Sequence, residues 1–272
     1  MTEAASRGTP VLEGRGLTKR YGPVVALENV DFAVYPGEIT ALVGDNGAGK
    51  STLVKILSGA VHADGGKIVH RQESVAFTSP HEARARGIET IYQDLALAQN
   101  RDVAANLFLG RELIFGGLLR PFAFLNRRAM VRVASKRLGE LGITVPFVAG
   151  LPVARLSGGQ RQAVAVARSA AWATDVLFMD EPTASLGVKQ SKAVLELAKR
   201  IAGHGVSVVL ITHVMPHVME VADRLVVLRH GRKVADLPSQ TVTTEELVSL
   251  IVGFDPGSED GSGEAEDAQA GV

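Results

Sequence analysis

Apolar positions recur along the chain with two different periods, which predicts both strands and helices. Within residues 11–43 apolar and polar positions alternate and end in a short apolar run before Gly44, as expected of successive strands. The segments 174–182 and 206–213 each contain a continuous apolar run, and residues 187–203 between them have helical spacing. Because continuous apolar strands alternate with helices, we expect a parallel sheet covered on both faces, in the α/β class.

The middle and the end of the chain carry different signals. Residues 102–170 are rich in alanine, leucine and arginine in helical patterns, so they predict a mainly helical insert in which Asn126 caps one helix. A hairpin turn is expected at residues 230–231. Thr243 and Glu246 have the spacing of a capping box at the start of the last helix. The pattern therefore places the insert between two halves that contain strands.

Composition limits the possible functions. The 272 residues are 46% hydrophobic and 21% charged, which is typical of a soluble globular protein with one sizeable core. The 29 basic and 29 acidic residues balance, so no general field attracts nucleic acid, and we expect no nucleic-acid partner. The chain contains no cysteine, which excludes disulfides, thiolate metal sites and cysteine nucleophiles.

The two ends of the sequence predict no membrane anchor. The first residues lack an apolar stretch after a basic start, and no run of about 18 apolar residues follows elsewhere. Any membrane role must therefore come through a partner. We expect residues 1–10 to be flexible. Residues 255–272 are glycine-rich and acidic, and we expect a disordered tail because they bury too little apolar surface to offset their ordering entropy.

The stretch GDNGAGKST fits the pattern of a phosphate-binding loop between an apolar strand and a helix. Glycines allow the backbone to curl so that several N–H groups point at one phosphate chain, and the helix N-terminus adds a positive dipole. Lys50 supplies a charge for the β and γ phosphates, and the Ser51 hydroxyl is placed for Mg²⁺. The alternative is a glycine-rich turn without a ligand. The candidate nucleotide ligands are Gly44, Asp45, Asn46, Gly47, Ala48, Gly49, Lys50, Ser51 and Thr52.

A pair of carboxylates follows the apolar run VLFM. Asp180 falls at the carboxyl end of the predicted strand, where open sheets place ligands, and we assign it to the Mg²⁺ shell. Glu181 lies one residue further, so its side chain points elsewhere and can act as general base toward the attacking water. The alternative is that both residues cap the next helix near Thr183.

A second glycine-rich stretch, LSGGQ, precedes an alanine-rich helix. Ser157 is an ordinary N-cap residue, which gives a purely structural explanation. Two successive glycines are unfavourable in a helix, however, and they expose N–H groups suited to an anion. We therefore expect a second anion site, for a different nucleotide or for the same nucleotide approached from another subunit. Its candidate residues are Ser157, Gly158, Gly159 and Gln160.

Together, residues 44–52, 156–160 and 176–182 resemble the ATP-binding cassette (ABC) ATPases. The resemblance implies a P-loop NTPase core with a mainly parallel sheet, an antiparallel β subdomain and an α-helical subdomain at about 94–172, all within an ATP-binding domain at 11–254. It implies ATP and Mg²⁺ as cofactors. It also implies that two copies dimerise head to tail, so that the LSGGQ signature of each copy closes over the γ-phosphate held by the other.

The same resemblance assigns further residues. Tyr21 is similar to the aromatic residue that stacks on adenine, although an ordinary strand tyrosine is the alternative. Gln93 looks like the glutamine that reaches Mg²⁺ and the attacking water. His213 looks like the switch histidine that binds the γ-phosphate. One departure is Gly187, because the family often has at this position an aspartate that links the two sites across the dimer.

The stretch IYQDLALAQNRDVAANLFLGRE resembles the cassettes of bacterial importers of ribose, xylose and fructose. This resemblance implies a homodimer on the cytoplasmic face of the cell membrane, bound to an integral-membrane permease and served indirectly by an extracytoplasmic sugar-binding protein. Hydrolysis of ATP would then drive uptake of a monosaccharide. The alternative is a soluble cassette ATPase that acts in repair, translation or cofactor assembly.

Overall fold

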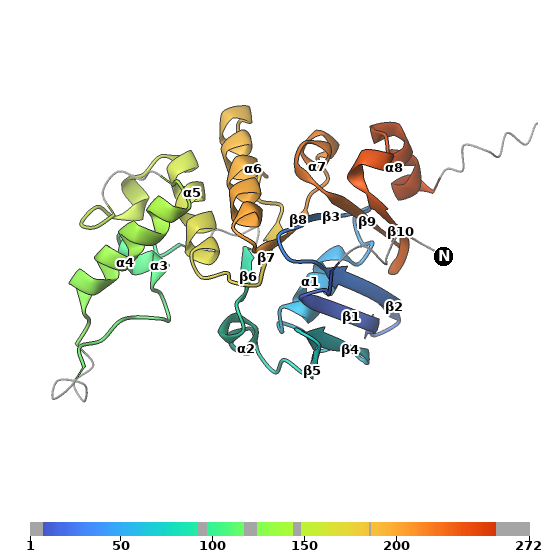
Figure 1. Ribbon diagram of the computed structural model, residues 1–272, viewed down its shortest axis with the longest axis horizontal. Helices are drawn as coiled ribbons and strands as arrows, with labels where there is room; N and C mark the ends of the chain where they lie inside the picture. The colour runs from blue at the N-terminus through green and yellow to red at the C-terminus, as the bar shows by residue number, and fades with distance from the viewer. Residues whose placement is uncertain (1–7, 92–96, 117–123, 144–147, 185, 254–272) are drawn as a thin grey trace, which may run out of the picture.

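The computed structural model describes residues 8–91, 97–116, 124–143, 148–184 and 186–253. Its central layer is a six-stranded sheet in the order β10-β9-β3-β8-β7-β6 (Figure 1). All neighbouring strands are parallel except the hairpin partners β9 and β10. The strands are β3 (Ile39–Val43), β6 (Ile88–Ile91), β7 (Val176–Asp180), β8 (Ser207–Ile211), β9 (Arg224–Arg229) and β10 (Arg232–Pro238).

A second sheet packs against one face of the first and is antiparallel, in the order β2-β1-β4-β5. Helix α1 lies between the two sheets in the same buried cluster (Figure 1). The predicted α/β class, with a mainly parallel sheet and an antiparallel part, is confirmed. The strands of this second sheet are β1 (Leu12–Tyr21), β2 (Val24–Val34), β4 (Gly65–His70) and β5 (Glu73–Val75).

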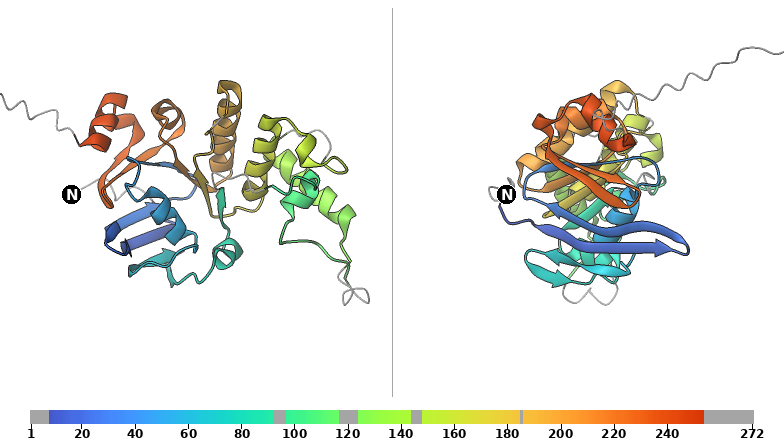
Figure 2. Two further views of the ribbon diagram at one scale, coloured as in Figure 1. Left: turned by 180° about the vertical axis from the view of Figure 1, so that it is seen from behind. Right: turned by 90° about the vertical axis from the view of Figure 1, so that its right-hand side faces the viewer.

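Helices cover the other face of the parallel sheet and form a separate part beyond its β6 edge. The reverse view shows this helical part on the opposite side of the parallel sheet from the antiparallel strands (Figure 2). The helices are α1 (Lys50–Leu57), α2 (Pro80–Ala85), α3 (Val103–Leu107), α4 (Arg127–Glu140), α5 (Gly158–Ala170), α6 (Val188–Gly203), α7 (Met215–Val221) and α8 (Thr244–Val252). Short 3₁₀ turns span Val153–Arg155 and Ser239–Thr241.

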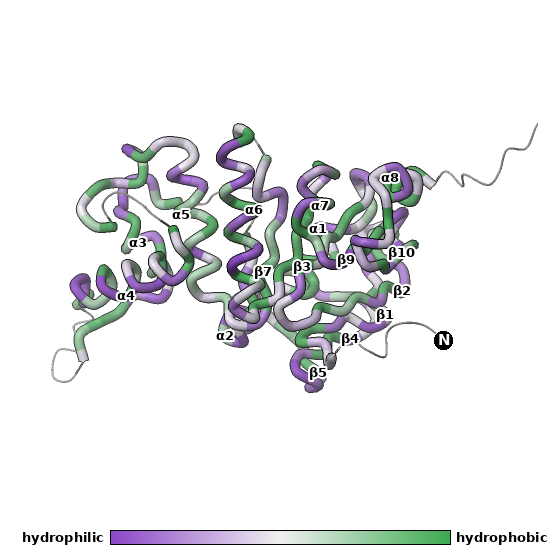
Figure 3. Tube along the Cα trace, turned by 45° about the horizontal axis from the view of Figure 1, so that its top comes forward, coloured by the Kyte–Doolittle hydropathy of each residue, from purple (hydrophilic) through white to green (hydrophobic). Residues whose placement is uncertain are grey.

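Strand β7 shows why the central strands read as continuous apolar runs. Phe178 faces the layer that contains α1 and the antiparallel sheet, whereas Leu177 and Met179 face the layer that contains α6. Successive side chains point to opposite faces of a strand, so a strand covered on both sides needs apolar residues at every position. Helix α6 is amphipathic, and its tube changes between hydrophobic and hydrophilic around each turn (Figure 3).

The helical part has its own apolar cluster, built by α3, α4 and α5. Phe108 packs edge-on against Trp172, with 5.1 Å between the ring centroids. The side chain of Asn126 accepts a hydrogen bond from the Ala129 N–H, which confirms the predicted cap of α4. The predicted capping box of α8 and the hairpin turn between β9 and β10 are also present. Among the described residues, no helix is long and apolar enough to cross a bilayer.

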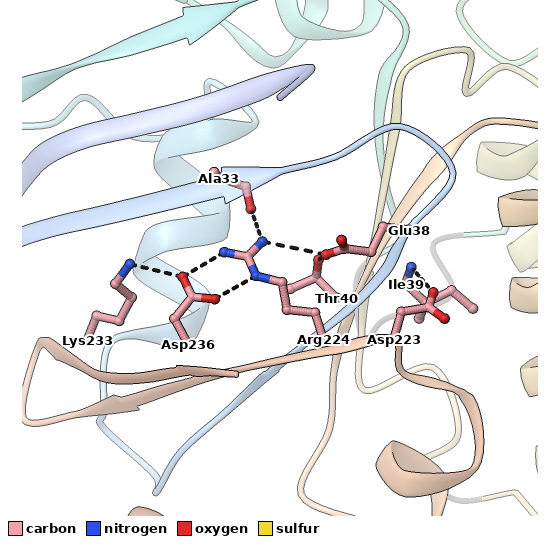
Figure 4. Close-up of polar contacts among 8 residues, drawn as sticks. All are labelled: Ala33, Glu38, Ile39, Thr40, Asp223, Arg224, Lys233 and Asp236. Carbon is pink, nitrogen blue, oxygen red and sulfur yellow. Dashed lines mark hydrogen bonds and ion pairs between the residues drawn. The ribbon is translucent and has the colours of Figure 1, made fainter. Parts of the chain in front are cut away.

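A buried arginine on β9 connects the two sheets (Figure 4). Arg224, which is 2% exposed, donates two hydrogen bonds to the Asp236 carboxylate on β10 and one, of 2.7 Å, to the Ala33 carbonyl on β2. Burial is the largest single effect and raises the pKa of Asp236, but the hydrogen bonds and positive charges of Arg224 and Lys233 together hold that pKa below its ordinary value. The pair is therefore charged and fixed at the contact between the sheets.

A second polar contact joins the sheets at the amino end of β7. The buried Asp175 carboxylate lies 2.8 Å from Nε2 of His70 and accepts hydrogen bonds of 2.6 and 2.8 Å from Arg71. Burial is the largest single effect and works to raise the pKa of Asp175, but the hydrogen bonds and electrostatic attraction of Arg71 and His70 together lower it. The chain thus pairs the start of β7 with the end of β4.

Candidate nucleotide-binding site

The loop between β3 and α1 carries the GDNGAGKST sequence and opens at the carboxyl end of the parallel sheet. Gly49 is the N-cap of α1, and no side chain among the described residues caps it. The first N–H groups of a helix lack carbonyl partners within that helix. The start of α1 therefore offers backbone donors to an anion, and the helix dipole favours negative charge at the same place.

Three glycines give the loop its curl. Gly44, Gly47 and Gly49 have φ of 147°, 82° and 104°, which side-chain-bearing residues rarely adopt. A Cβ on Gly44 would lie 2.1 Å from the Leu228 carbonyl oxygen, and one on Gly49 would lie 2.5 Å from the Ala26 carbonyl oxygen. The glycines therefore serve the protein's own packing as well as any ligand, because the loop is pressed against β9 and β2.

Lys50 folds back across the loop that precedes it. Its Nζ donates to the carbonyl oxygens of Gly44 (2.7 Å) and Asp45 (2.9 Å). Burial lowers the pKa of Lys50, and the nearby carboxylates Glu181 and Asp180 offset part of that effect. The ammonium group thus stands inside the loop, beside the carboxylates that end β7.

Asp180 ends β7 facing the loop, as its position in the sequence predicts. Burial is the larger cause and the adjacent Glu181 the smaller cause of its raised pKa. A cation near Asp180 would relieve both effects. Within the described part of the chain, no three acidic, histidine or cysteine side chains gather closely enough to hold a metal. One carboxylate and the Ser51 hydroxyl fit Mg²⁺ that shares its shell with phosphates, since Mg²⁺ is commonly bound in that way.

Glu181 occupies a different position from Asp180, as expected of the next residue along. Its Oε1 lies 2.8 Å from Nδ1 of His213, and the Thr212 hydroxyl donates to its Oε2 at 3.4 Å. Neither carboxylate caps the next helix, because α6 begins at Val188 with Gly187 as its N-cap. The alternative that the acidic pair is a helix cap is therefore wrong.

A cavity of about 700 Å³ lies against the loop, which is within the range of about 300–1,000 Å³ common for ligand pockets. Tyr21 on β1 lines the cavity and keeps 47% of its surface exposed. Residues 44–52, Asp180, Glu181 and His213 also line it, so one cavity contains most of the predicted site. An exposed aromatic ring beside a phosphate-binding loop is suited to stack on a nucleotide base.

The LSGGQ turn lies elsewhere. Ser157 accepts a hydrogen bond from the Gln160 N–H, and the Gln160 side chain accepts one from the Ser157 N–H. The two residues therefore form a capping box at the start of α5. Among the described residues, those that line the cavity do not include this turn. Helix α5 lies on the far side of α6 from α1 (Figure 1). A single chain therefore does not bring its two glycine-rich helix starts to one ligand.

Two residues stand apart from the predicted set that lines the cavity. Gln93 lies outside the described residues, so its role as a ligand of Mg²⁺ and water stays a prediction. Thr212 was not anticipated, although it contacts the Glu181 carboxylate. The sequence feature that could have predicted this contact is the position of Thr212 between an apolar strand and His213. A threonine at that position is equally typical of an ordinary strand end.

The two sheets, the helical part and this site define an ATP-binding cassette. A crystal structure described as a nucleotide-free ATP-binding cassette from an ABC transporter matches with a TM-score of 0.75, over 91% of this chain and 96% of that chain, at 25% identity. The chain belongs to the ABC transporter family, which matches residues 27–184.

Curated relatives extend the match to nearly the whole chain. A fructose import ATP-binding protein of Rhizobium meliloti is 49% identical over 245 residues, which cover 90% of this chain and 94% of that protein. A ribose import ATP-binding protein of Rubrobacter xylanophilus is 44% identical, and the match covers 90% of this chain and 47% of that protein. The chain thus spans about half the length of the second relative. The expected resemblance to monosaccharide-importer cassettes is confirmed.

Proposed function

We propose that this chain is the ATP-binding and ATP-hydrolysing subunit of an importer that takes up a monosaccharide through a partner permease. The observation that carries this proposal is the 49% identity to a fructose import ATP-binding protein over 94% of that protein's length. The site geometry supports hydrolysis specifically, because a carboxylate and an imidazole meet beside the phosphate-binding loop.

In this mechanism residues 44–52 bind the triphosphate, Lys50 turns from the loop carbonyls to the β and γ phosphates, and Tyr21 stacks on the base. Ser51, Asp180 and Gln93 would hold Mg²⁺, which neutralises charge on the phosphate oxygens when bound. Glu181 accepts a proton from the attacking water, and His213 holds the carboxylate in position relative to the γ-phosphate. Thr212 restrains the same carboxylate from its other oxygen.

A lone chain holds only half of each active site in this proposal. Ser157 and Gly159 do not line the cavity of their own chain, which supports a role at a nucleotide held by a second copy. Two chains would associate head to tail, and each signature turn would direct its N–H groups to the other chain's γ-phosphate. Closing and reopening of this pair would do conformational work on the permease, so the sugar need not touch this chain.

We place the working complex at the cytoplasmic face of the membrane, held there by the permease and supplied by an extracytoplasmic sugar-binding protein. The test is to co-express the chain with its permease, reconstitute the complex in vesicles and measure ATP-dependent transport of labelled fructose, ribose and xylose. Uptake of one sugar that requires ATP supports the proposal. ATP hydrolysis by a chain that purifies with a soluble assembly instead would favour the alternative of a non-transport ATPase.

A further inference from the structure

Helix α5 holds a buried glutamine against the segment that follows Glu181. Gln162 is 8% exposed, and its Nε2 donates a hydrogen bond of 2.9 Å to the Pro182 carbonyl oxygen. Gln162 lies one turn beyond the signature turn that starts α5. The hydrogen bond therefore joins the signature helix to the residue next to the proposed general base.

The backbone of Glu181, the residue before Pro182, is constrained by its own conformation and by two hydrogen bonds. Glu181 has a φ of 49°, a left-handed conformation that costs free energy in a residue with a side chain. Its N–H donates to the Ile211 carbonyl (2.9 Å), and its carbonyl accepts from the Ala184 N–H (3.1 Å). Since this conformation persists only when its surroundings fix it, a displacement of Pro182 is transmitted to the Glu181 backbone.

A second contact ties the signature turn to the start of α6 by packing. The side chain of Gln190 on α6 lies between Gly159 of the signature turn and Gly187 of the turn before α6. A Cβ on Gly159 would lie 2.9 Å from Cγ of Gln190, and a Cβ on Gly187 would lie 2.9 Å from its Oε1. Glycine at both positions lets α5 and the turn before α6 share one side chain. The signature helix is therefore tied to this region at two separate points.

We infer that Gln162 is a positioning residue that couples the signature turn to Glu181 within one chain. The inference rests on the proposed function, in which the signature turn serves the partner copy's nucleotide while Glu181 acts on the nucleotide of its own chain. Engagement of the turn shifts α5, and the Gln162 hydrogen bond carries that shift to Pro182 and Glu181. Each active site thereby responds to the other through the protein interior. Such a route is needed here because position 187 is a glycine and offers no carboxylate to link the two sites across the dimer.

The first test is Gln162→Met in the full chain, because methionine keeps the length and shape of glutamine and removes the donor. We expect KM for ATP to change by less than about twofold, kcat to fall by about 10- to 100-fold, and the Hill coefficient for ATP to fall toward 1. A merely structural role would lower the active fraction and leave the Hill coefficient unchanged. Gln240→Met, at an exposed position, is the matched control and should behave as the wild type.

A double-mutant cycle asks whether Gln162 acts through Glu181. Adding Gln162→Met to Glu181→Gln should change the residual hydrolysis rate by less than about twofold, because the group that Gln162 positions is already removed. A further loss as large as in the wild-type background would overturn the inference. Wild-type cooperativity and kcat in Gln162→Met would overturn it as well.

Hydrogen exchange on the nucleotide-free full chain tests the contact without any turnover. Gln162→Met should raise the exchange rates of the Glu181 and Ala184 amides by about tenfold or more and leave the β3 amides unchanged. Unchanged exchange at both amides would overturn the coupling. This readout separates two failures, because a wild type that hydrolyses no ATP would count against the proposed function while exchange still decides the role of Gln162.

Discussion

Glu181 and His213 meet at the ends of two neighbouring parallel strands, with 2.8 Å between Oε1 of the carboxylate and Nδ1 of the imidazole. Strands β7 and β8 are in register at this edge, since Asp180 pairs with Ile211. The register brings residues 32 positions apart to one point. The fold therefore pre-orients the carboxylate beside the phosphate-binding loop.

Glu181→Gln should bind ATP, form a stable dimer with it and hydrolyse it poorly. The amide keeps the size of the side chain but cannot accept a proton, and general-base catalysis contributes about 10²–10⁴-fold. Steady-state phosphate release and size-exclusion chromatography with ATP are the measurements. A variant that stays monomeric with wild-type turnover would contradict the assignment of Glu181.

His213→Ala should lower kcat by about 10²-fold, as for loss of one pre-organised polar group, and should leave nucleotide affinity nearly intact. The imidazole contacts Glu181 rather than the loop residues, so its loss frees the carboxylate without altering the phosphate cradle. His62→Ala, at an exposed position, is the control. Equal turnover of the two variants would show that the pair is incidental.

Lys50→Ala should weaken ATP binding by about 10- to 100-fold, because a hydrogen bond to a charged group contributes about 1.5–3 kcal/mol. Fluorescence titration with a labelled nucleotide measures the effect, and Lys67→Ala, at an exposed position on β4, is the control. Unchanged affinity in the Lys50 variant would remove the loop from the phosphate site. Thermal unfolding without nucleotide checks that the loop itself still folds.

Arg224→Met should lower the free energy of unfolding by about 3 kcal/mol, because the half-buried Asp236 carboxylate loses two hydrogen bonds from a buried guanidinium and keeps only its contact with Lys233. For a domain of this size that is a drop in Tm on the order of 10 °C. Arg232→Met removes an exposed ion pair with Glu28 and should cost about 1 kcal/mol or less. Similar Tm losses in the two variants would contradict the role given to burial.

Acid should weaken the contact between the sheets at Asp175. The folded-state pKa of Asp175 is below its ordinary value, so the unfolded chain binds the proton more tightly and the stabilisation is present above the unfolded pKa. It is lost as the pH falls from the unfolded pKa, about 4 for an aspartate, through the lower folded pKa. Denaturant titrations across this range should show a shallower pH dependence for Asp175→Asn. A slope equal to that of the wild type would mean that this carboxyl does not contribute.

Much of the fold follows from local patterns. The strands β3, β7 and β8 are apolar at nearly every position, and the caps at Asn126 and Thr243 depend on residues three positions apart. The phosphate-binding loop is equally local, because its dihedral angles require glycine at Gly44 and Gly49. Such features need only a few neighbouring residues, so the sequence contains all the information that predicts them.

Other features depend on partners that are remote in the chain. The sequence could not show that Gly44 faces the Leu228 carbonyl, that Gln162 reaches Pro182 or that Thr212 contacts Glu181, since each requires the register of strands and helices that meet only after folding. The sequence by itself determined the secondary-structure elements, the fold class and the reactive groups of this protein. Only the tertiary structure decided which of those groups touch, because a side-chain contact depends on distances of a few ångströms that no local pattern specifies.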